Sequence, residues 1–545
     1  MPARPITQQD FSGGMNAVAN PFLLTRKQVR DARNLLLHEH GSLTVRPGYK
    51  VLSVSPDLAN AVVYRGVLVQ STGLVAEVAI QRGTVNTLYQ TNTTPWTKIG
   101  DFGTPELIPD AAIVDDKLFL ANGYEVPRVW DGSVFSAITA QATQTLPPGA
   151  KHVLFHFGAV WIWNTAPASS NLDGPSSLRM SNFAASVGAT PAPLDKDNPF
   201  GKAKVSDWPT SNQTFVSKDD GQEGMGGATY TIAETGISPR AAMVLFKNFS
   251  CYQVDGVFGS TNFGIQKIKS DMGCIAPRTI QFVSGFGIIR LGHKGFALYN
   301  GVDDRLISEE VRPFLFGNED HAGLNFQAVL RSWASQSQTP PLYIAACPVA
   351  GATTLTRLFV FDLIRRGWTI ADLPIPIQCL SLFFTPTVAP VVHAGTATGG
   401  RIVRLFSGDL TDDGALIGWS AKTKPETSGS QTRPSYFQRA ILDVTYRSSQ
   451  QVQITATPVS ITPTGESKLV ATRSVLTSPI VGSAYGAAKY GTAVYGASTF
   501  RGGRVTIPVH RQGSAMYLDI TGRGQAVIRG LEWHIKPKPI TRVRV

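Results

Sequence analysis

The chain has 545 residues, of which 43% are hydrophobic and 16% charged, and its net charge is +12. This length exceeds what one compact core accommodates, so we expect two to four domains, each able to fold without disulfide or metal staples. The first ten residues contain no apolar run of the kind found in a signal peptide, so export by that route is not expected.

Two further features restrict the class of protein. The four cysteines are scattered and form no Cys-x-x-Cys pair, which predicts buried free thiols rather than a disulfide framework or a zinc ribbon; they are Cys251, Cys274, Cys347 and Cys379. Two long uncharged stretches, 332–356 and 373–400, are interrupted by prolines, which break helical hydrogen bonding repeatedly. We therefore expect buried strands and turns there, and no membrane span.

The first fifty residues contain three motifs with turn chemistry: Phe-Ser-Gly-Gly at 11–14, Asp-Ala-Arg-Asn at 31–34 and Arg-Pro-Gly-Tyr at 46–49. The two glycines free the backbone to bend, and Pro47-Gly48 predicts a type II turn in which glycine takes positive φ. We interpret residues 1–55 as an N-terminal assembly arm with a first strand. Phe11 and Met15 are predicted as assembly contacts, and removal of residues 1–20 is expected to impair docking before it impairs folding.

Residues 56–425 consist of short apolar or alternating runs, each closed by a turn signal. Asn-Gly and Asp-Gly pairs between such runs are strong hairpin signals, because a type I′ turn needs positive φ at both central residues. They occur at 122–123, 131–132, 255–256 and 300–301. Units of one or two hairpins, repeating at roughly forty to sixty residues, are typical of β-propeller blades. We predict an all-β fold with a propeller over 56–425, and a pair of β-sandwiches is the alternative.

The composition between Thr411 and Arg433 is that of a linker, and alternating strands follow it. We predict an antiparallel β-sandwich-like platform over 426–545, to which the N-terminal arm is added. Within it, Tyr485, Tyr490 and Tyr495 are each followed by glycine, which suits a tight loop that presents its rings to a partner. The alternative is a loop whose rings pack on its own domain.

The C-terminal part of the chain is strongly basic. From residue 501 to the end there are nine lysines and arginines against two acidic residues. Such a charge density attracts a polyanion whatever its nucleotide sequence. The candidates for contact with DNA are Arg501, Arg504, Arg523 and Arg529. The alternative is a solvated surface or one that forms salt bridges between subunits.

We find no catalytic pattern in the sequence. A Gly-x-Ser-x-Gly motif is absent, and the segment 287–294 has His293 at the position where a phosphate-binding loop needs its lysine, with no serine or threonine after it. Pairs of adjacent aspartates occur at 115–116, 219–220, 303–304 and 412–413. Such residues are typical of turns, where the side chain accepts hydrogen bonds from nearby backbone N–H groups. We therefore predict a protein that is not an enzyme, with no cofactor and no metal.

The order of the three N-terminal motifs resembles the tail-nozzle proteins of short-tailed bacteriophages, also called tail tubular protein B or packaged-DNA stabilisation proteins. Looser similarity continues at 176–182, 243–256 and 273–301. The resemblance implies a β-propeller with an added β-domain, assembled as a sixfold ring below the portal and adaptor. It also implies that the ring continues the DNA channel, retains the packaged genome and seats tail fibres, a tailspike or a needle.

Our first hypothesis is thus a structural virion protein of the phage tail, assembled in the host cytoplasm. It would form a ring, with six copies implied by the resemblance, and would contact double-stranded DNA without sequence specificity. The second hypothesis is a receptor- or glycan-binding propeller at the tail tip. The third is a propeller hydrolase with its site in the central channel.

Overall fold

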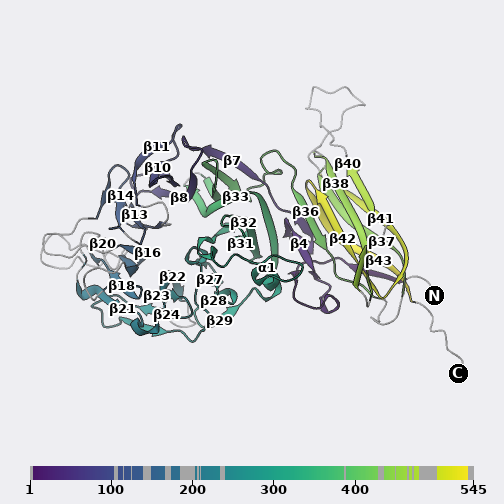
Figure 1. The fold of residues 1–545 in the computed structure, drawn as a ribbon, viewed down its shortest axis with the longest axis horizontal. Coiled ribbons are helices and arrows are strands. Elements are labelled where there is room, and N and C mark those ends of the chain that lie inside the picture. Colours follow the sequence, from purple (N-terminus) through teal and green to yellow (C-terminus); the bar gives the residue numbers. More distant parts are fainter. Residues whose placement is uncertain are drawn as a thin grey trace.

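The computed structural model describes most of the chain: residues 4–103, 109–114, 116–123, 125–138, 149–165, 173–183, 203–204, 208, 210–232, 240–385, 388–427, 435–447, 450–462, 465–468, 472–477 and 500–537. Over these residues the fold is almost entirely β, with one short α-helix, α1 (Arg312–Phe316). A β-propeller forms one half of the molecule and a β-sandwich forms the other, as Figure 1 shows. The predicted fold class is confirmed.

Five blades of the propeller are separate four-stranded antiparallel sheets that follow one another along the chain. The first consists of β8 (Ala61–Val69), β9 (Val75–Arg82), β10 (Asn86–Gln90) and β11 (Thr97–Asp101). The second consists of β12 (Asp110–Val114), β13 (Lys117–Ala121), β14 (Arg128–Trp130) and β15 (Phe135–Ala137). The third consists of β16 (Ala150–His156), β17 (Ala159–Thr165), β18 (Ser177–Met180) and β21 (Gln213–Phe215). The fourth consists of β22 (Gly224–Ile232), β23 (Arg240–Lys247), β24 (Cys251–Asp255) and β25 (Gly264–Lys267). The fifth consists of β26 (Gln281–Val283), β27 (Gly287–Gly292), β28 (Gly295–Tyr299) and β29 (Asp304–Leu306).

The sixth and seventh blades share one long strand, β33 (Trp368–Thr385). Its first part pairs with β32, and its second part pairs with β34. The sixth blade therefore contains β30 (Trp333–Gln338), β31 (Pro341–Pro348), β32 (Leu355–Asp362) and the start of β33. The seventh contains the end of β33, β34 (Val388–Thr396), β35 (Arg401–Leu405) and β7 (Tyr49–Val54). Because β7 comes from the N-terminal part of the chain, it closes the ring of blades.

The sandwich combines strands from both ends of the chain. One sheet contains β41 (Phe500–Gly513), β37 (Ser435–Arg447), β43 (Ala526–Pro537), β6 (Leu43–Val45) and β5 (Leu35–Leu37), and β1 (Arg4–Gln8) pairs with β43. The other contains β4 (Asp31–Arg33), β36 (Gly418–Lys422), β42 (Ala515–Arg523), β38 (Val452–Thr462), β39 (Gly465–Lys468) and β40 (Arg473–Thr477). The last propeller strand ends at Leu405 and β36 already belongs to the sandwich, so the predicted division at residue 425 falls after β36.

One apolar core joins the two halves. It includes side chains of the N-terminal arm, of the sandwich sheets and of the fifth and sixth blades, among them Phe11, Phe296, Trp368 and Trp533. The short strands β2 (Gly14–Met15) and β3 (Gln28–Val29) of the arm pair with each other in parallel beside this core. The arm is therefore part of the folded body.

The turn signals mark real chain reversals, but the predicted type I′ turns are wrong. Only the glycine of each pair takes positive φ, for example 84° at Gly123 and 98° at Gly301, and the residue before it does not. The loops are longer than two residues. Asn300 Oδ1 accepts a 2.7 Å hydrogen bond from the backbone N–H of Asp303, which stabilises the loop without a second positive φ.

The cysteine prediction is confirmed, because all four thiols are free and buried. Burial raises the pKa of Cys251 to about 11 and that of Cys347 to about 12. Across the described ranges, no group of three or more His, Cys, Asp or Glu is placed to hold a metal ion. No helix within those ranges is long and apolar enough to cross a membrane.

Candidate functional site

The axis of the propeller contains a cavity of about 600 Å³. All seven blades contribute to its lining through β8, β12, β16, β22, β30, the end of β33, and the segment that leads into β26. This volume lies in the usual range for small-ligand pockets, about 300–1,000 Å³. The major groove of double-stranded DNA is by itself about 12 Å wide, so a whole duplex is too wide for a cavity of this volume. The axis of a single propeller therefore cannot hold a duplex.

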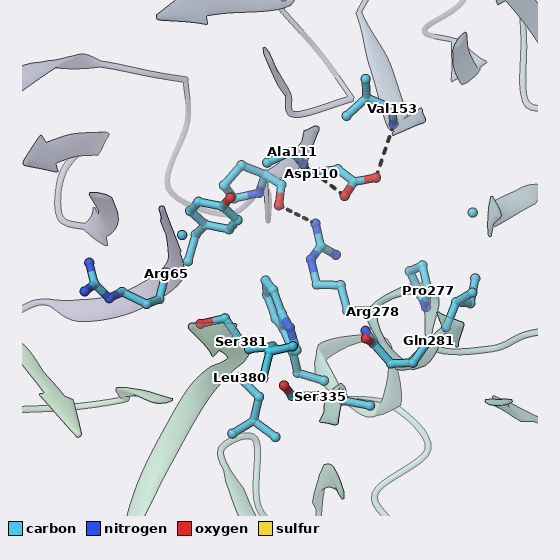
Figure 2. A pocket seen from close by; sticks show the side chains of 18 of the residues that line it. Arg65, Asp110, Ala111, Val153, Pro277, Arg278, Gln281, Ser335, Leu380 and Ser381 are labelled. Carbon is cyan, nitrogen blue, oxygen red and sulfur yellow. Dashed lines mark hydrogen bonds between the residues drawn. The ribbon is translucent and has the colours of Figure 1, made fainter. Parts of the chain in front are cut away.

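Arg278 extends into this cavity. It belongs to the 3₁₀ turn η5 (Pro277–Thr279), and its guanidinium donates a 2.7 Å hydrogen bond to the backbone carbonyl of Pro109, which precedes the second blade. The guanidinium also lies 5.1 Å from the ring centroid of Trp333, within cation–π distance. Figure 2 shows this side chain pointing from the fifth blade toward Asp110, with Ser335, Leu380 and Ser381 below Arg278 in the view.

Asp110 and His152 form a second polar group in the cavity wall. The Asp110 carboxylate lies 3.5 Å from His152 Nδ1 and accepts a 3.2 Å hydrogen bond from the backbone N–H of Val153. Burial by itself would raise the pKa of Asp110. The hydrogen bond with His152 and the positive charge of Arg278 outweigh that effect, so the pKa lies below its usual value and the group is ionised at neutral pH.

The cavity offers binding groups rather than a recognisable catalytic set. Ser335 is 1% exposed and Ser381 is half-buried, and neither hydroxyl has a hydrogen-bond partner in the described structure. No described hydrogen bond links either hydroxyl to His152, so a nucleophile–base–acid chain is not assembled there. The arrangement can hold a small polar molecule through Arg278, Asp110 and the two hydroxyls.

A separate polar cluster lies where the propeller meets the sandwich, and Arg46 is its centre. Arg46 is 2% exposed, and its guanidinium forms two hydrogen bonds to the Asp412 carboxylate, at 2.9 and 2.7 Å. It also donates to Asn34 Oδ1 at 3.0 Å, and Gln525 Nε2 donates to the Arg46 carbonyl at 3.2 Å. These contacts connect the N-terminal arm to the linker and to the β42–β43 turn.

Asn34 and Gly48 complete this junction. Asn34 adopts φ of 56°; its Oδ1 accepts a 3.0 Å hydrogen bond from the Asp372 N–H, and its Nδ2 donates to the Gly418 carbonyl at 2.7 Å. Gly48 does not take positive φ, so the predicted type II turn is wrong. Glycine is needed there because a Cβ would lie 1.8 Å from the Thr411 carbonyl oxygen. All three N-terminal motifs therefore have structural roles that the sequence pattern did not indicate.

The structure contradicts the interpretation of Phe11 and Met15 as assembly contacts. Their side chains are 1% and 0% exposed and belong to the central core. Gly14, with φ of 68°, allows this approach, since a Cβ would lie 3.0 Å from the Trp368 backbone. The arm contributes to the fold itself, so removal of residues 1–20 is now expected to impair folding. Tyr485, Tyr490 and Tyr495 lie outside the described residues.

The four predicted DNA-contacting arginines occupy both sheets of the sandwich. Arg504 lies on the edge strand β41 and forms a 3.0 Å ion pair with Glu532. Arg529 is exposed and is the extra residue of a β-bulge in β43, whereas Arg523 is exposed at the end of β42 in the other sheet. Of Arg501 only the backbone can be described, which pairs with Tyr446. Sequence reasoning identified this basic region but did not predict that Arg504 has an acidic partner.

Arg46, Asp110 and Arg278 were not predicted as site residues. Arg46 belongs to one of the motifs that carry the resemblance, and Arg278 belongs to another matching segment, but neither segment indicated a partner for its arginine. Their partners are distant in sequence: Asp412 for Arg46, and Pro109 for Arg278. A single sequence contains no signal for such pairs.

Comparison with known proteins does not establish a family. No protein-family model and no curated protein matches the sequence. Among solved structures, a complex described as BBS1N with ARL6DN contains a chain that is 10% identical, with a TM-score of 0.40, over 67% of this chain and 99% of that one. Sqt1 of Saccharomyces cerevisiae is 11% identical, with a TM-score of 0.37, over 69% of this chain and 96% of Sqt1. At these values the similarity supports no conclusion about function, and the fold assignment stands on the sheet topology above.

Proposed function

We propose that this chain is a structural virion protein of a phage tail, a nozzle or tail-tube subunit. Copies of it would form a ring, six in number on the family resemblance, below the portal and adaptor. The ring would continue the DNA channel, retain the packaged genome, and seat fibres, a tailspike or a needle. The proposal includes no chemical reaction.

The observation that supports this proposal most is the convergence of the three N-terminal motifs. Phe11 and Gly14 pack in the core between the halves, and Asn34 and Arg46 connect the arm to the linker before the sandwich. The residues that resemble the nozzle family are thus those that join a propeller to a platform in this chain. A similarity that involved only exposed turns would carry much less weight.

The geometry limits where DNA would pass. The axis of one propeller contains a small-ligand cavity, and Arg278 extends across part of it, so a DNA conduit would have to be formed between subunits. A head-to-tail interface that closes after a full rotation gives a ring with such a central opening. The exposed Arg523 and Arg529 are our candidates for the charge that faces DNA.

Ring formation is the first test. We expect purified protein, alone or mixed with a portal–adaptor complex, to form rings of uniform copy number in negative-stain images and sedimentation experiments. Virions that contain the chain should carry it at the end of a short tail. Protein that remains monomeric under all these conditions, or particles that lack the chain, would overturn the proposal.

DNA contact is the second test. Replacing Arg523 and Arg529 by glutamate should lower the affinity of the assembled ring for duplex DNA and reduce the salt dependence by about one in slope per lost phosphate contact. The matched control replaces two exposed propeller residues, Lys267 and Arg305, by glutamate, which changes the net charge equally. Equal loss in both variants would show that only net charge matters and would remove the assignment of these two arginines.

The axial cavity favours one second candidate, a receptor- or glycan-binding propeller. Arg278, Asp110 and Ser335 could hydrogen-bond the hydroxyl or acidic groups of a sugar, and Trp333 lies beside them. Binding on a glycan array that is lost in Arg278→Ala would support this function. Array binding that persists in Arg278→Ala would place the glycan outside the cavity.

A further inference from the structure

The junction between the first and the last blade contains a second cavity, of about 590 Å³. We call it the seam cleft. Its walls come from β7, β33, β34 and β35 on one side, and on the other from the first blade, including the loop 91–96 between β10 and β11. It is distinct from the axial cavity, although Arg65 contributes to the lining of both. Its volume also suits a small ligand or a few side chains of a bound segment.

Large apolar side chains remain uncovered in this cleft. Leu52, Val54 and Val388 are 43%, 46% and 45% exposed, and Trp96, which also lines the cleft, is 6% exposed. Leu52 is the extra residue of a β-bulge in β7, opposite the step between Ile402 and Val403. Side chains alternate along β7, so Leu52 faces away from the core on which the preceding Val51 packs. A contiguous exposed apolar patch rimmed by polar groups is typical of an interaction site.

Two arginines and one glutamate line the cleft, and each arginine is paired with a carboxylate. Arg65 is 2% exposed at the side chain and forms an ion pair with Glu77, while Arg404, 32% exposed, pairs with Asp409. His393, stacked on a phenylalanine ring, is uncharged at neutral pH, since burial and the neighbouring arginines lower its pKa to about 3. Further positive charge comes from the exposed side chains of the flanking residues, Lys50 and Arg401, which pair in register with Arg404 and Val54.

The backbone next to the apolar patch also has a free edge. In the described part of the chain, β7 pairs with β35 along one side and with no strand along the other. Such an edge presents unpaired N–H and C=O groups that can bind an added extended strand. Side chains on one face of that strand, two residues apart, could then reach both Leu52 and Lys50, which also lie two residues apart and on one face of β7.

From these observations we propose that the seam cleft binds an extended segment of a partner protein that carries apolar and acidic side chains two residues apart, on the same face of the strand. The apolar side chains would cover Leu52, Val54 and Val388, and the acidic ones would face Lys50 and Arg401. The inference concerns a different surface from the one that would face DNA. It goes beyond the proposed tail function and does not depend on it.

The test uses the full chain and two arrays of octapeptides. In one array Asp or Glu stands two residues from Val, Leu or Phe, on the same face of an extended strand; in the other Lys or Arg replaces the acidic residues. We expect binders in the acidic array only, and their affinity, measured by fluorescence anisotropy of labelled peptides, should fall at least about tenfold in Leu52→Ser/Val54→Ser. Lys50→Glu/Arg401→Glu should also weaken binding. Both pairs of residues are exposed, so the variants should retain the fold, which the melting temperature will verify.

The matched control is Val302→Ser/Ile364→Ser, which removes two other exposed apolar side chains, 81% and 67% exposed, and should leave peptide binding unchanged. Absence of acidic binders, equal binding of the basic array, or equal loss in the control would overturn the proposal. A change of oligomeric state in Leu52→Ser/Val54→Ser, seen by sedimentation without loss of peptide binding, would instead assign the cleft to a second copy of this chain and would also overturn it. If Leu52→Ser/Val54→Ser loses peptide binding but still assembles into rings, peptide binding in the cleft and the proposed tail function are tested independently of each other.

Discussion

The most deeply buried ion pair of the propeller contrasts with the exposed ion pair on the edge strand of the sandwich. The Arg290 and Asp304 side chains of the fifth blade are 0% and 1% exposed, while Arg504 of the sandwich is 66% exposed beside Glu532. A buried ion pair is expensive to break, because the remaining charge is left without compensation in a medium of low dielectric. An exposed pair contributes little. The Arg290–Asp304 pair therefore stabilises the interior of the fifth blade, whereas Arg504 stays largely open to solvent on the sandwich.

The largest effect should distinguish these two kinds of pair. Arg290→Ala should lower the free energy of unfolding by about 3–5 kcal/mol, since it leaves the Asp304 carboxylate buried without its partner. Arg504→Ala should change it by at most about 1 kcal/mol. Denaturant titration of both variants measures the difference, and comparable losses in the two would show that burial does not distinguish these two ion pairs.

A substitution in the N-terminal arm tests whether the arm, like the blades, contributes buried side chains to the stability of the fold. Met15→Ala should cost about 2–5 kcal/mol of stability, because Met15 is 0% exposed in the shared core. The control is Leu23→Ala in the same arm, where the side chain is 75% exposed and little change is expected. A stable Met15→Ala protein with impaired assembly would restore the arm as a docking element.

Two glycines sharpen the comparison at the level of the backbone. Gly48→Ala at the junction should destabilise the protein by about 1–3 kcal/mol, since the new methyl group would overlap the Thr411 carbonyl and force the chain to move. Gly418→Ala in the sandwich strand β36 meets no atom within 4 Å and should be tolerated. Thermal unfolding of the two variants provides the measurement, and a tolerated Gly48→Ala would show that the linker yields easily.

The smallest effect is a difference in pH dependence between two glutamates. Burial raises the pKa of Glu310, which contacts the arm through Gln28, to about 7, against an ordinary value of 4.5. The folded state therefore holds this proton more tightly, and its contribution to stability is lost as pH rises from about 4.5 through 7. Stability curves of the wild type and Glu310→Gln should converge at low pH and separate above it, with the variant more stable.

Glu466 in the sandwich should behave with the opposite sign. Burial would raise its pKa, but hydrogen bonds from Tyr517 and Arg30 and the charge of Arg30 lower it below the ordinary value. Its contribution is present above pH 4.5 and is lost as pH falls through the lower folded-state pKa. Glu466→Gln should therefore lose stability at neutral pH and match the wild type in acid. A change of the same sign in both variants would contradict the assigned environments.

Local pattern was enough to predict much of the architecture. Alternating apolar runs with Gly-containing turns indicated an all-β chain, and their repetition indicated a propeller followed by a sandwich. Scattered cysteines predicted buried thiols. These inferences succeeded because strand periodicity, turn residues and cysteine spacing are properties of short segments, which a single sequence displays directly.

Only the tertiary structure decided which residues meet across the fold. It paired Arg46 with Asp412, brought Arg278 to Pro109, and placed β7 beside β35 to close the propeller. It also moved Phe11 and Met15 from a predicted docking surface into the core. The physical reason is that burial and ion pairing depend on contacts between segments hundreds of residues apart, whereas the sequence pattern around each residue reports only its own strand or turn. The same limit applies to the seam cleft, which exists because the first and last blades meet without covering Leu52 and Val54.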